Sequence, residues 1–257
     1  MRERPGDAAA EALLLAGGAR AILLQLANPA VGRGVAEHSD FADRPLDRLR
    51  GTLTYLYVVA FGTPQEVTRV ARQVGRAHAP VRSESHDSDD SYDARDETLQ
   101  LWVAATLYDT AVLMHELVFG ALTAPQAQAL LDEGAAIATT LGVPRALWPA
   151  TPADFAAYWS RCESELRVDD AAARVAAALL HPRSGPWWFR LAMPSVRLLT
   201  AGLLSPELRA AYALPLDDRR YSRAVRVLRA VYPRLPRAIR HWPKRHYLRR
   251  FRAEAGK

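Results

Sequence analysis

Three polar side chains lie in two neighbouring segments that are otherwise largely apolar, and their spacing could support chemistry. Arg48 and Thr52 are four residues apart in RLRGTLTYLYVVAFG, so one side of a helix would carry both. His78 continues a valine series at helical spacing in the next segment, which predicts an inward ring near the helix end. An inward histidine, arginine and hydroxyl form either a hydrogen-bonded core network or a metal ligand facing a polar pair across a planar cofactor. Spacing alone does not separate these two interpretations.

The elements that must position these residues are helices. TPQE (63–66) and TAPQ (123–126) have the pattern of capping boxes with proline at the first helical position. Further helices are expected from Thr151, from Asp169 and over 94–119, where one apolar stripe predicts a central helix. No alternating run of strand length is present. The sequence therefore predicts an all-α fold, with a single domain of roughly ten helices over 1–257.

Composition limits the classes of protein that fit. The chain has 257 residues, 49% of them hydrophobic, which is enough for a buried core. Cys162 is the single cysteine, so an intramolecular disulfide and a thiolate cluster are excluded, and we expect it to be a small packed residue. We interpret the N-terminus as an amphipathic helix without a signal peptide, and the apolar windows 99–119 and 187–204 contain charges that disfavour a membrane span. A cytoplasmic location is expected.

Positive charge is concentrated in the C-terminal segment. From Arg219 to the end there are fourteen Lys or Arg and one acid, Glu254, on an otherwise slightly acidic chain. We expect helical pieces whose arginines are solvated or paired with acids elsewhere. Interleaved aromatics such as Trp242, and the pair Trp187 and Trp188, also suit peripheral contact with an anionic membrane. No helix-turn-helix, zinc-finger or RNP pattern is present, so a nucleic-acid partner is not expected.

The common enzymatic signatures are missing. The sequence contains no G-x-S-x-G elbow, P-loop, strand-borne G-x-G-x-x-G or H-E-x-x-H. A carboxylate-bridged di-iron centre would need Glu-x-x-His on paired helices, and HELVFG (115–120) has the reverse order and occurs once. These classes are therefore disfavoured.

Several further polar residues are candidates. His38 is either a surface or capping residue or a contact to a pocket or cofactor. Asp109 is expected to form a structural salt bridge with an arginine. Tyr92, at the end of the acidic loop 83–97, would be a packing anchor or close over a pocket. His115 would interact with the end of its helix or line a pocket, and His86 would be solvated.

Four fragments carry a family resemblance. GGARAILLQLANPAVGRGVAEHSDF, RPLDRLRGTLTYLYVVAFGT, AHAPVRS and YDARDETLQLWVAATLYDT occur in this order. Together they resemble the MpaB-type oxygenase family, whose catalytic domain is shared with bacterial latex-clearing rubber oxygenases. The similarity extends from about Gly17 to at least Pro149, and the following helical segments are consistent with it.

The resemblance implies a globin-like helical domain that holds haem b and uses dioxygen. The family's axial histidine lies in an H-x-x-V element, which matches His78 and Val81 here. Its distal arginine and threonine match Arg48 and Thr52. His78 would bind the iron, Arg48 would stabilise negative charge on reduced oxygen, and Thr52 would donate or relay a hydrogen bond.

The chain departs from the family pattern at three positions. Latex-clearing enzymes can carry a lysine just before the threonine, where this chain has Gly51. The family often has histidine in its Q-L-A-H-P and W-V-H-A-T elements, where this chain has Asn28 and Ala104. The roles of that lysine and of the second histidine therefore do not transfer.

We thus expect a haem b-dependent, oxygen-using oxidoreductase that acts on a hydrophobic small molecule, isoprenoid or alkene-containing as the family implies. One alternative is a haem-dependent tailoring oxidase of specialised metabolism that acts on a polar metabolite. Others are a non-catalytic haem carrier or gas sensor, and a haem-free protein whose basic tail docks on a membrane or nucleic acid.

Overall fold

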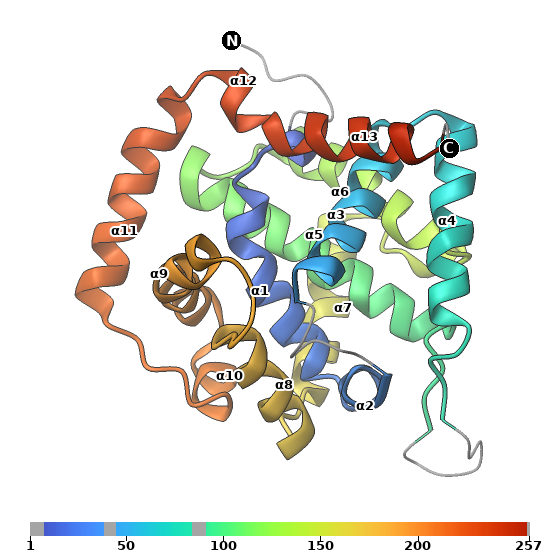
Figure 1. Cartoon of the computed structure of the whole chain (residues 1–257), viewed down its shortest axis with the longest axis horizontal. Coiled ribbons are helices and arrows are strands. Elements are labelled where there is room, and N and C mark those ends of the chain that lie inside the picture. Colours follow the sequence, from blue (N-terminus) through green and yellow to red (C-terminus); the bar gives the residue numbers. More distant parts are fainter. Residues whose placement is uncertain (1–7, 39–44, 84–90, 256–257) are drawn as a thin grey trace.

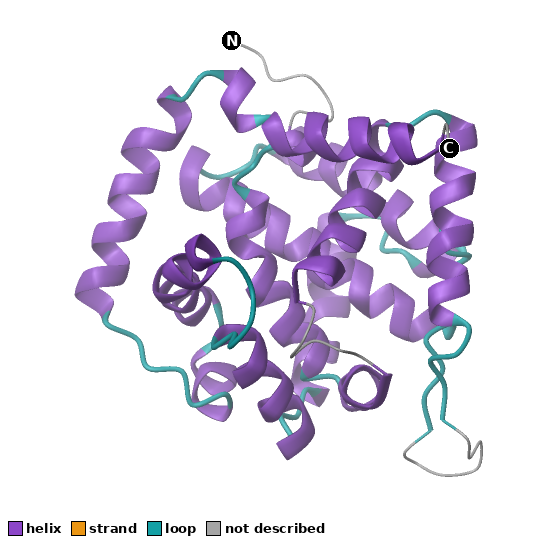
Figure 2. Cartoon of the chain, in the orientation of Figure 1, coloured by secondary structure: helices purple, strands orange, loops and turns teal. Residues whose placement is uncertain are grey.

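The structure, a computed structural model, describes residues 8–38, 45–83 and 91–255, which form helices joined by short connections (Figures 1 and 2). Within these ranges there are thirteen α-helices, three short 3-10 helices and no strand. The all-α prediction is confirmed. The helix number exceeds the expected ten partly because two short helices follow residue 205, namely α10 (Pro206–Ala211) and α12 (Arg237–Arg240).

Two helices form the centre of the fold. α1 (Leu14–Leu26) packs along α5 (Glu97–Phe119), and α1 also contacts α2 (Pro29–His38), α8 (Asp170–Leu180) and α9 (Trp187–Leu203). The close approach of α1 and α5 depends on Gly17, because a Cβ there would lie 2.6 Å from the Thr110 methyl group and 2.8 Å from Met114. The prediction of a central helix near 94–119 is confirmed.

The single buried stripe expected on α5 is wrong. Residues on almost every side of the helix are buried, including Leu101, Ala104, Ala105 and Tyr108. A helix with neighbours all round is apolar all round, so its sequence does not mark a solvent side.

A buried arginine ties three helices together. Arg20 on α1 forms a 2.7 Å ion pair with Asp109 and donates a 2.7 Å hydrogen bond to Thr110, both on α5. Its Nε donates to the Leu203 carbonyl at the end of α9, at 2.9 Å. Burial raises the pKa of Asp109, and the charge and hydrogen bond of Arg20 oppose that shift. The predicted salt bridge of Asp109 is confirmed, and its partner is Arg20.

Three helices begin at capping boxes. α4 (Pro64–His78) has the Thr63–Glu66 box, and α6 (Ala124–Thr139) has the Thr123–Gln126 box, as predicted. α7 (Pro152–Glu165) has a third box, in which Asp154 pairs with Thr151. Each box satisfies backbone N–H groups that lack a partner within the helix.

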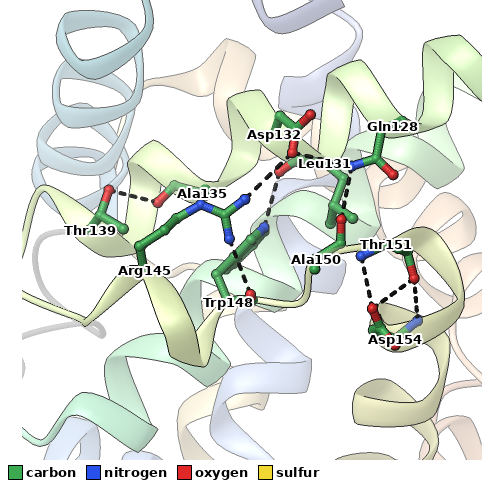
Figure 3. Close-up of polar contacts among 10 residues, drawn as sticks. All are labelled: Gln128, Leu131, Asp132, Ala135, Thr139, Arg145, Trp148, Ala150, Thr151 and Asp154. Carbon is green, nitrogen blue, oxygen red and sulfur yellow. Dashed lines mark hydrogen bonds and ion pairs between the residues drawn. The ribbon is translucent and has the colours of Figure 1, made fainter.

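The connection between α6 and α7 is held against α6 by side chains (Figure 3). The Trp148 indole N–H donates to the Leu131 carbonyl at 3.0 Å, and the Gln128 amide donates to the Ala150 carbonyl at 2.9 Å. Arg145 bridges this connection to α6 through Asp132, at 3.5 Å. Trp148 is thereby fixed in a core cluster with Tyr108 and Phe155.

The basic C-terminal segment folds back over the N-terminal helices. It consists of α11 (Asp218–Val231), α12 and α13 (Trp242–Ala255), and α13 packs on α3 (Pro45–Phe61) (Figure 1). Arg240 pairs with buried Glu11 at 2.9 Å, and Arg252 pairs with Glu66 at 2.7 Å. The prediction of helical pieces whose arginines partly pair with acids elsewhere is confirmed.

No single helix of the described segments is long and apolar enough to cross a membrane, and one pair, α1 with α2, meets that test only as a span bent by 105°.

Candidate functional site

The α3–α4 hairpin brings Arg48 and His78 together. The two helices pack against each other and are joined only by Gly62 and Thr63. Arg48 lies near the start of α3 and His78 ends α4, so an antiparallel pair places them at the same end. The charge of Arg48 lowers the pKa of His78, which requires the two side chains to be near each other. We call this region the Arg48–His78 site.

The lowered pKa of His78 favours a neutral imidazole at neutral pH, and one ring nitrogen, Nδ1, has no hydrogen-bond partner among the described residues. The residue is half-buried on the side of α4 that also carries Val70 and Val74, as the spacing predicted. Burial is the largest cause of its lowered pKa, and the charge of Arg48 adds to it. His78 Nδ1 is buried and has no hydrogen-bond partner among the described residues. Such an atom costs free energy unless a partner satisfies it, and neutral imidazole is the form that binds metals.

Arg48 and Thr52 are exposed, so the prediction that they face inward is wrong. Their side of α3 also carries Tyr55, which is buried and donates a 2.5 Å hydrogen bond to the Ile137 carbonyl of α6. The packing of α6 thus covers this side of α3 at Tyr55, one to two turns beyond Thr52 and Arg48. Burial nevertheless lowers the pKa of Arg48.

His38, the last residue of α2, belongs to a second polar group. The Tyr92 hydroxyl donates a 2.5 Å hydrogen bond to Glu37 and lies 3.2 Å from His38 Nδ1. Burial and the contact with Glu37 raise the pKa of Tyr92 to about 12, so the hydroxyl keeps its proton at neutral pH. His38 is exposed, and Tyr92 is buried as a packing anchor.

Tyr92 of this group and Val81, which follows His78 in the chain, both pack close to Gly34 on α2. A Cβ at Gly34 would lie 3.1 Å from the Tyr92 ring and 3.6 Å from Val81. Val81 and Tyr92 therefore pack over the same turn of α2. The flanks of the acidic loop pair with each other through an isolated bridge between Arg82 and Asp93. His86 lies outside the described residues.

The three departures from the family pattern differ in their surroundings. Gly51 faces open space, since a Cβ there meets no atom within 4 Å, so packing does not exclude a longer side chain. Asn28 accepts a 3.1 Å hydrogen bond from the Val31 N–H at the start of α2, which is a capping role. Ala104 is buried in the core cluster that contains Tyr108 and Trp148.

The remaining candidates lie apart from the site. His115 is buried near the end of α5, with its ring 5.0 Å from that of Phe119, so it packs in the core in addition to lying in the last helical turns. Cys162 is half-buried, and burial raises the pKa of its thiol, as expected for a packed residue. Within the described ranges no three His, Cys, Asp or Glu side chains gather as a metal site.

Sequence reasoning missed Glu37 and Arg20. Glu37 precedes His38 in a polar stretch, and only the fold shows that Tyr92 binds it. Arg20 could have been found, because it is the only charge in the apolar run LLAGGARAILLQL.

Comparison with known proteins identifies the family. Residues 7–230 match the family model described as the catalytic domain of ER-bound oxygenase mpaB/B' and rubber oxygenase. The chain belongs to this oxygenase family, as the sequence fragments predicted.

Two curated relatives are similar over nearly the whole chain. Uncharacterised proteins of Mycobacterium bovis and Mycobacterium tuberculosis are each 35% identical over 246 residues, covering 92% of this chain and 96% of the relative. No solved structure matches the chain significantly.

Proposed function

We propose that the protein is a haem b-dependent oxygenase that acts on a hydrophobic small molecule, with His78 as the iron ligand. The observation that carries this proposal is His78 itself. Its buried Nδ1 has no partner in the described part of the chain, and burial and Arg48 lower its pKa, which favours the neutral form that binds metals.

The donor set fits haem. A metal held by protein side chains alone needs several donors in one place, and the described residues offer no such group. A single imidazole suits an iron whose equatorial ligands come from a macrocycle. When bound, haem would supply the redox chemistry that activates dioxygen.

The chain's own residues would provide the polar environment. Arg48, near His78 and in contact with solvent, would stabilise negative charge that develops beside the imidazole. Thr52, one turn further along the same side of α3, would orient a polar atom of the substrate or donate a hydrogen bond to it. His38 would contact the cofactor or exchange a proton through the Tyr92 hydroxyl, 3.2 Å away.

A hydrophobic, isoprenoid or alkene-containing substrate is proposed on family grounds. A cytoplasmic location remains our prediction.

Absorption spectroscopy tests the cofactor directly. Protein produced with haem supplied should show a Soret band, and the pyridine haemochrome spectrum should identify haem b. A colourless protein that does not take up added haem would exclude the proposal.

Oxygen consumption separates an oxygenase from a haem carrier or sensor. The haem-loaded protein should consume dioxygen when an isoprenoid or other alkene is added, and Arg48→Ala should reduce that rate while retaining the Soret band. A haem protein that consumes no oxygen with any such substrate would indicate the carrier or sensor alternative.

A further inference from the structure

Large apolar side chains stand exposed on the first two turns of α9. Trp187 is 75% exposed, Trp188 is 53% exposed and Leu191 is 71% exposed. At 3.6 residues per turn the three project within an arc of about 100°. We call these three residues the α9 tip. Exposed tryptophans clustered in this way mark an interaction site more often than a solvated surface.

The N-terminal half of α9 has few side chains that pack against the rest of the protein. From Trp187 to Ser195 only Phe189 and Met193 are half-buried or buried, one turn apart on the opposite side. From Val196 to Leu203 every residue is at least half-buried. The C-terminal half of α9 is therefore anchored in the fold, and its N-terminal half presents the tip.

The surroundings of the tip are positively charged. Residues 181–205 contain three arginines and no acid. Of these, Arg183 and Arg190 are exposed and form no ion pair within the described segments, while Arg197 donates to the Leu180 carbonyl.

α11 adds further charge beside α9 (Figure 1). The Tyr221 ring lies directly over Gly202, so α11 contacts the anchored C-terminal half of α9, about three turns from the tip. α11 carries exposed arginines without an ion pair in the described ranges at 219, 223, 226 and 229, and a paired one at 220. The acids nearest in the sequence are Glu207, Asp217 and Asp218, and the arginines of α11 outnumber them.

Tryptophan and arginine together suit a lipid surface. Indole has a large apolar face and one N–H donor, so it is favoured where hydrocarbon meets headgroups. Arginines beside it attract anionic headgroups. A second copy of the chain is a poorer partner, because a two-fold contact centred on the tip would bring Arg183 and Arg190 close to their own equivalents.

We propose that the α9 tip inserts into the interface of an anionic membrane, with Arg183 and Arg190 binding lipid headgroups. This inference does not depend on haem or on the proposed reaction.

Vesicle co-sedimentation tests it. The full chain should bind vesicles of equal parts phosphatidylglycerol and phosphatidylcholine, bind pure phosphatidylcholine much less, and dissociate at high salt. The variant W187A/W188A/L191S should lose binding. The control Leu147→Ser, at an exposed apolar residue outside this region, should bind normally.

Charge variants measure how much the arginines near the tip contribute to membrane binding. R183Q/R190Q should weaken partition into anionic vesicles by roughly tenfold or more, because each basic side chain near the surface contributes to attraction. The control R72Q/R76Q removes the same charge from α4, on the opposite side of the molecule (Figure 1), and should have a much smaller effect.

Tryptophan fluorescence provides the second readout. Brominated lipid should quench the emission of the full chain, and the tip variant should lose that quenching. Absence of vesicle binding, binding unaffected by the tip substitutions, or a concentration-dependent dimer that the same substitutions dissociate would each overturn the proposal.

Discussion

Arg48 and His78 lie at the same end of the α3–α4 hairpin, and the positive charge of Arg48 contributes to the lowered pKa of His78. The two residues are thirty positions apart in the chain. A two-residue connection and antiparallel packing are sufficient to bring them together.

Removing this charge should raise the pKa of His78. In haem-free Arg48→Met the imidazole loses a nearby cation, so its protonated form becomes less unfavourable. The pKa should still remain below its ordinary value, because burial is the larger cause. NMR titration of the His78 ring checks this, with Arg72→Met on the exposed side of α4 as control. An unchanged or lower pKa in Arg48→Met would show that the two groups are not coupled.

Gly17 and Gly18 should respond oppositely to alanine. Gly17→Ala places a methyl group against Thr110 and Met114 and should destabilise the protein by about 1–3 kcal/mol. Gly18→Ala meets no atom within 4 Å and should stabilise it by roughly 0.5–1 kcal/mol. Denaturant unfolding measures both free energies of unfolding. Equal effects would contradict the close packing of α1 on α5.

Arg20 and Asp109 should contribute to the free energy of unfolding in a coupled, non-additive way. Arg20 is 9% and Asp109 24% exposed, and Arg20→Met leaves the carboxylate without its partner. We expect a loss of about 3 kcal/mol, at the lower end for buried pairs because Asp109 retains some solvent contact.

A double-mutant cycle provides the check on this pair. The variant R20M/D109L should be clearly more stable than the sum of the single changes predicts. Additive losses would mean that the two side chains do not interact.

Glu66 should contribute to acid sensitivity. The hydrogen bond from Arg252 and the capping contact with Thr63 lower the pKa of Glu66 from 4.5 to about 2. In that window the unfolded chain binds more protons, so this stabilisation is present above pH 4.5 and is lost as pH falls toward 2. Because the Arg252 side chain is half exposed, the effect should be small and weakened by salt.

Glu66→Gln provides the comparison. Glutamine can complete a capping box, as Gln126 does on α6, but it does not titrate. Unfolding curves between pH 5 and 2 should therefore fall less steeply for the variant. Identical pH dependence would show that Glu66 is not coupled to folding.

Local signals predicted the secondary structure well. The boxes at Thr63 and Thr123 are complete within four residues, so sequence alone locates the starts of α4 and α6. The salt bridge of Asp109 was also predictable, because a carboxylate in an apolar helix requires a cation. Arg20 stands out as the only charge in its apolar run, but the pairing of these two residues depends on the packing of α1 against α5.

The exposure of a side chain depends on packing between helices that are distant in the sequence. The sequence did not predict the exposure of several side chains on α3 and α5 correctly. Arg48 and Thr52 share a side of α3 with buried Tyr55, and the spacing of Arg48 and Thr52 led to the wrong prediction that they face inward. α6 packs over Tyr55, whereas Arg48 and Thr52 are exposed. On α5 the error is the opposite one, because more residues are buried than the sequence predicted. Neighbouring helices cover α5 on almost every side and bury residues outside the expected stripe.

Chemical rescue of His78 tests the central claim most directly. In His78→Gly, loaded with haem, the Soret band should be lost or strongly shifted, and added imidazole should restore it by occupying the vacated position. His181→Gly, at an exposed histidine that immediately follows α8, should retain the wild-type spectrum. A Soret band unchanged in His78→Gly without imidazole would show that another group binds the iron and would contradict the account.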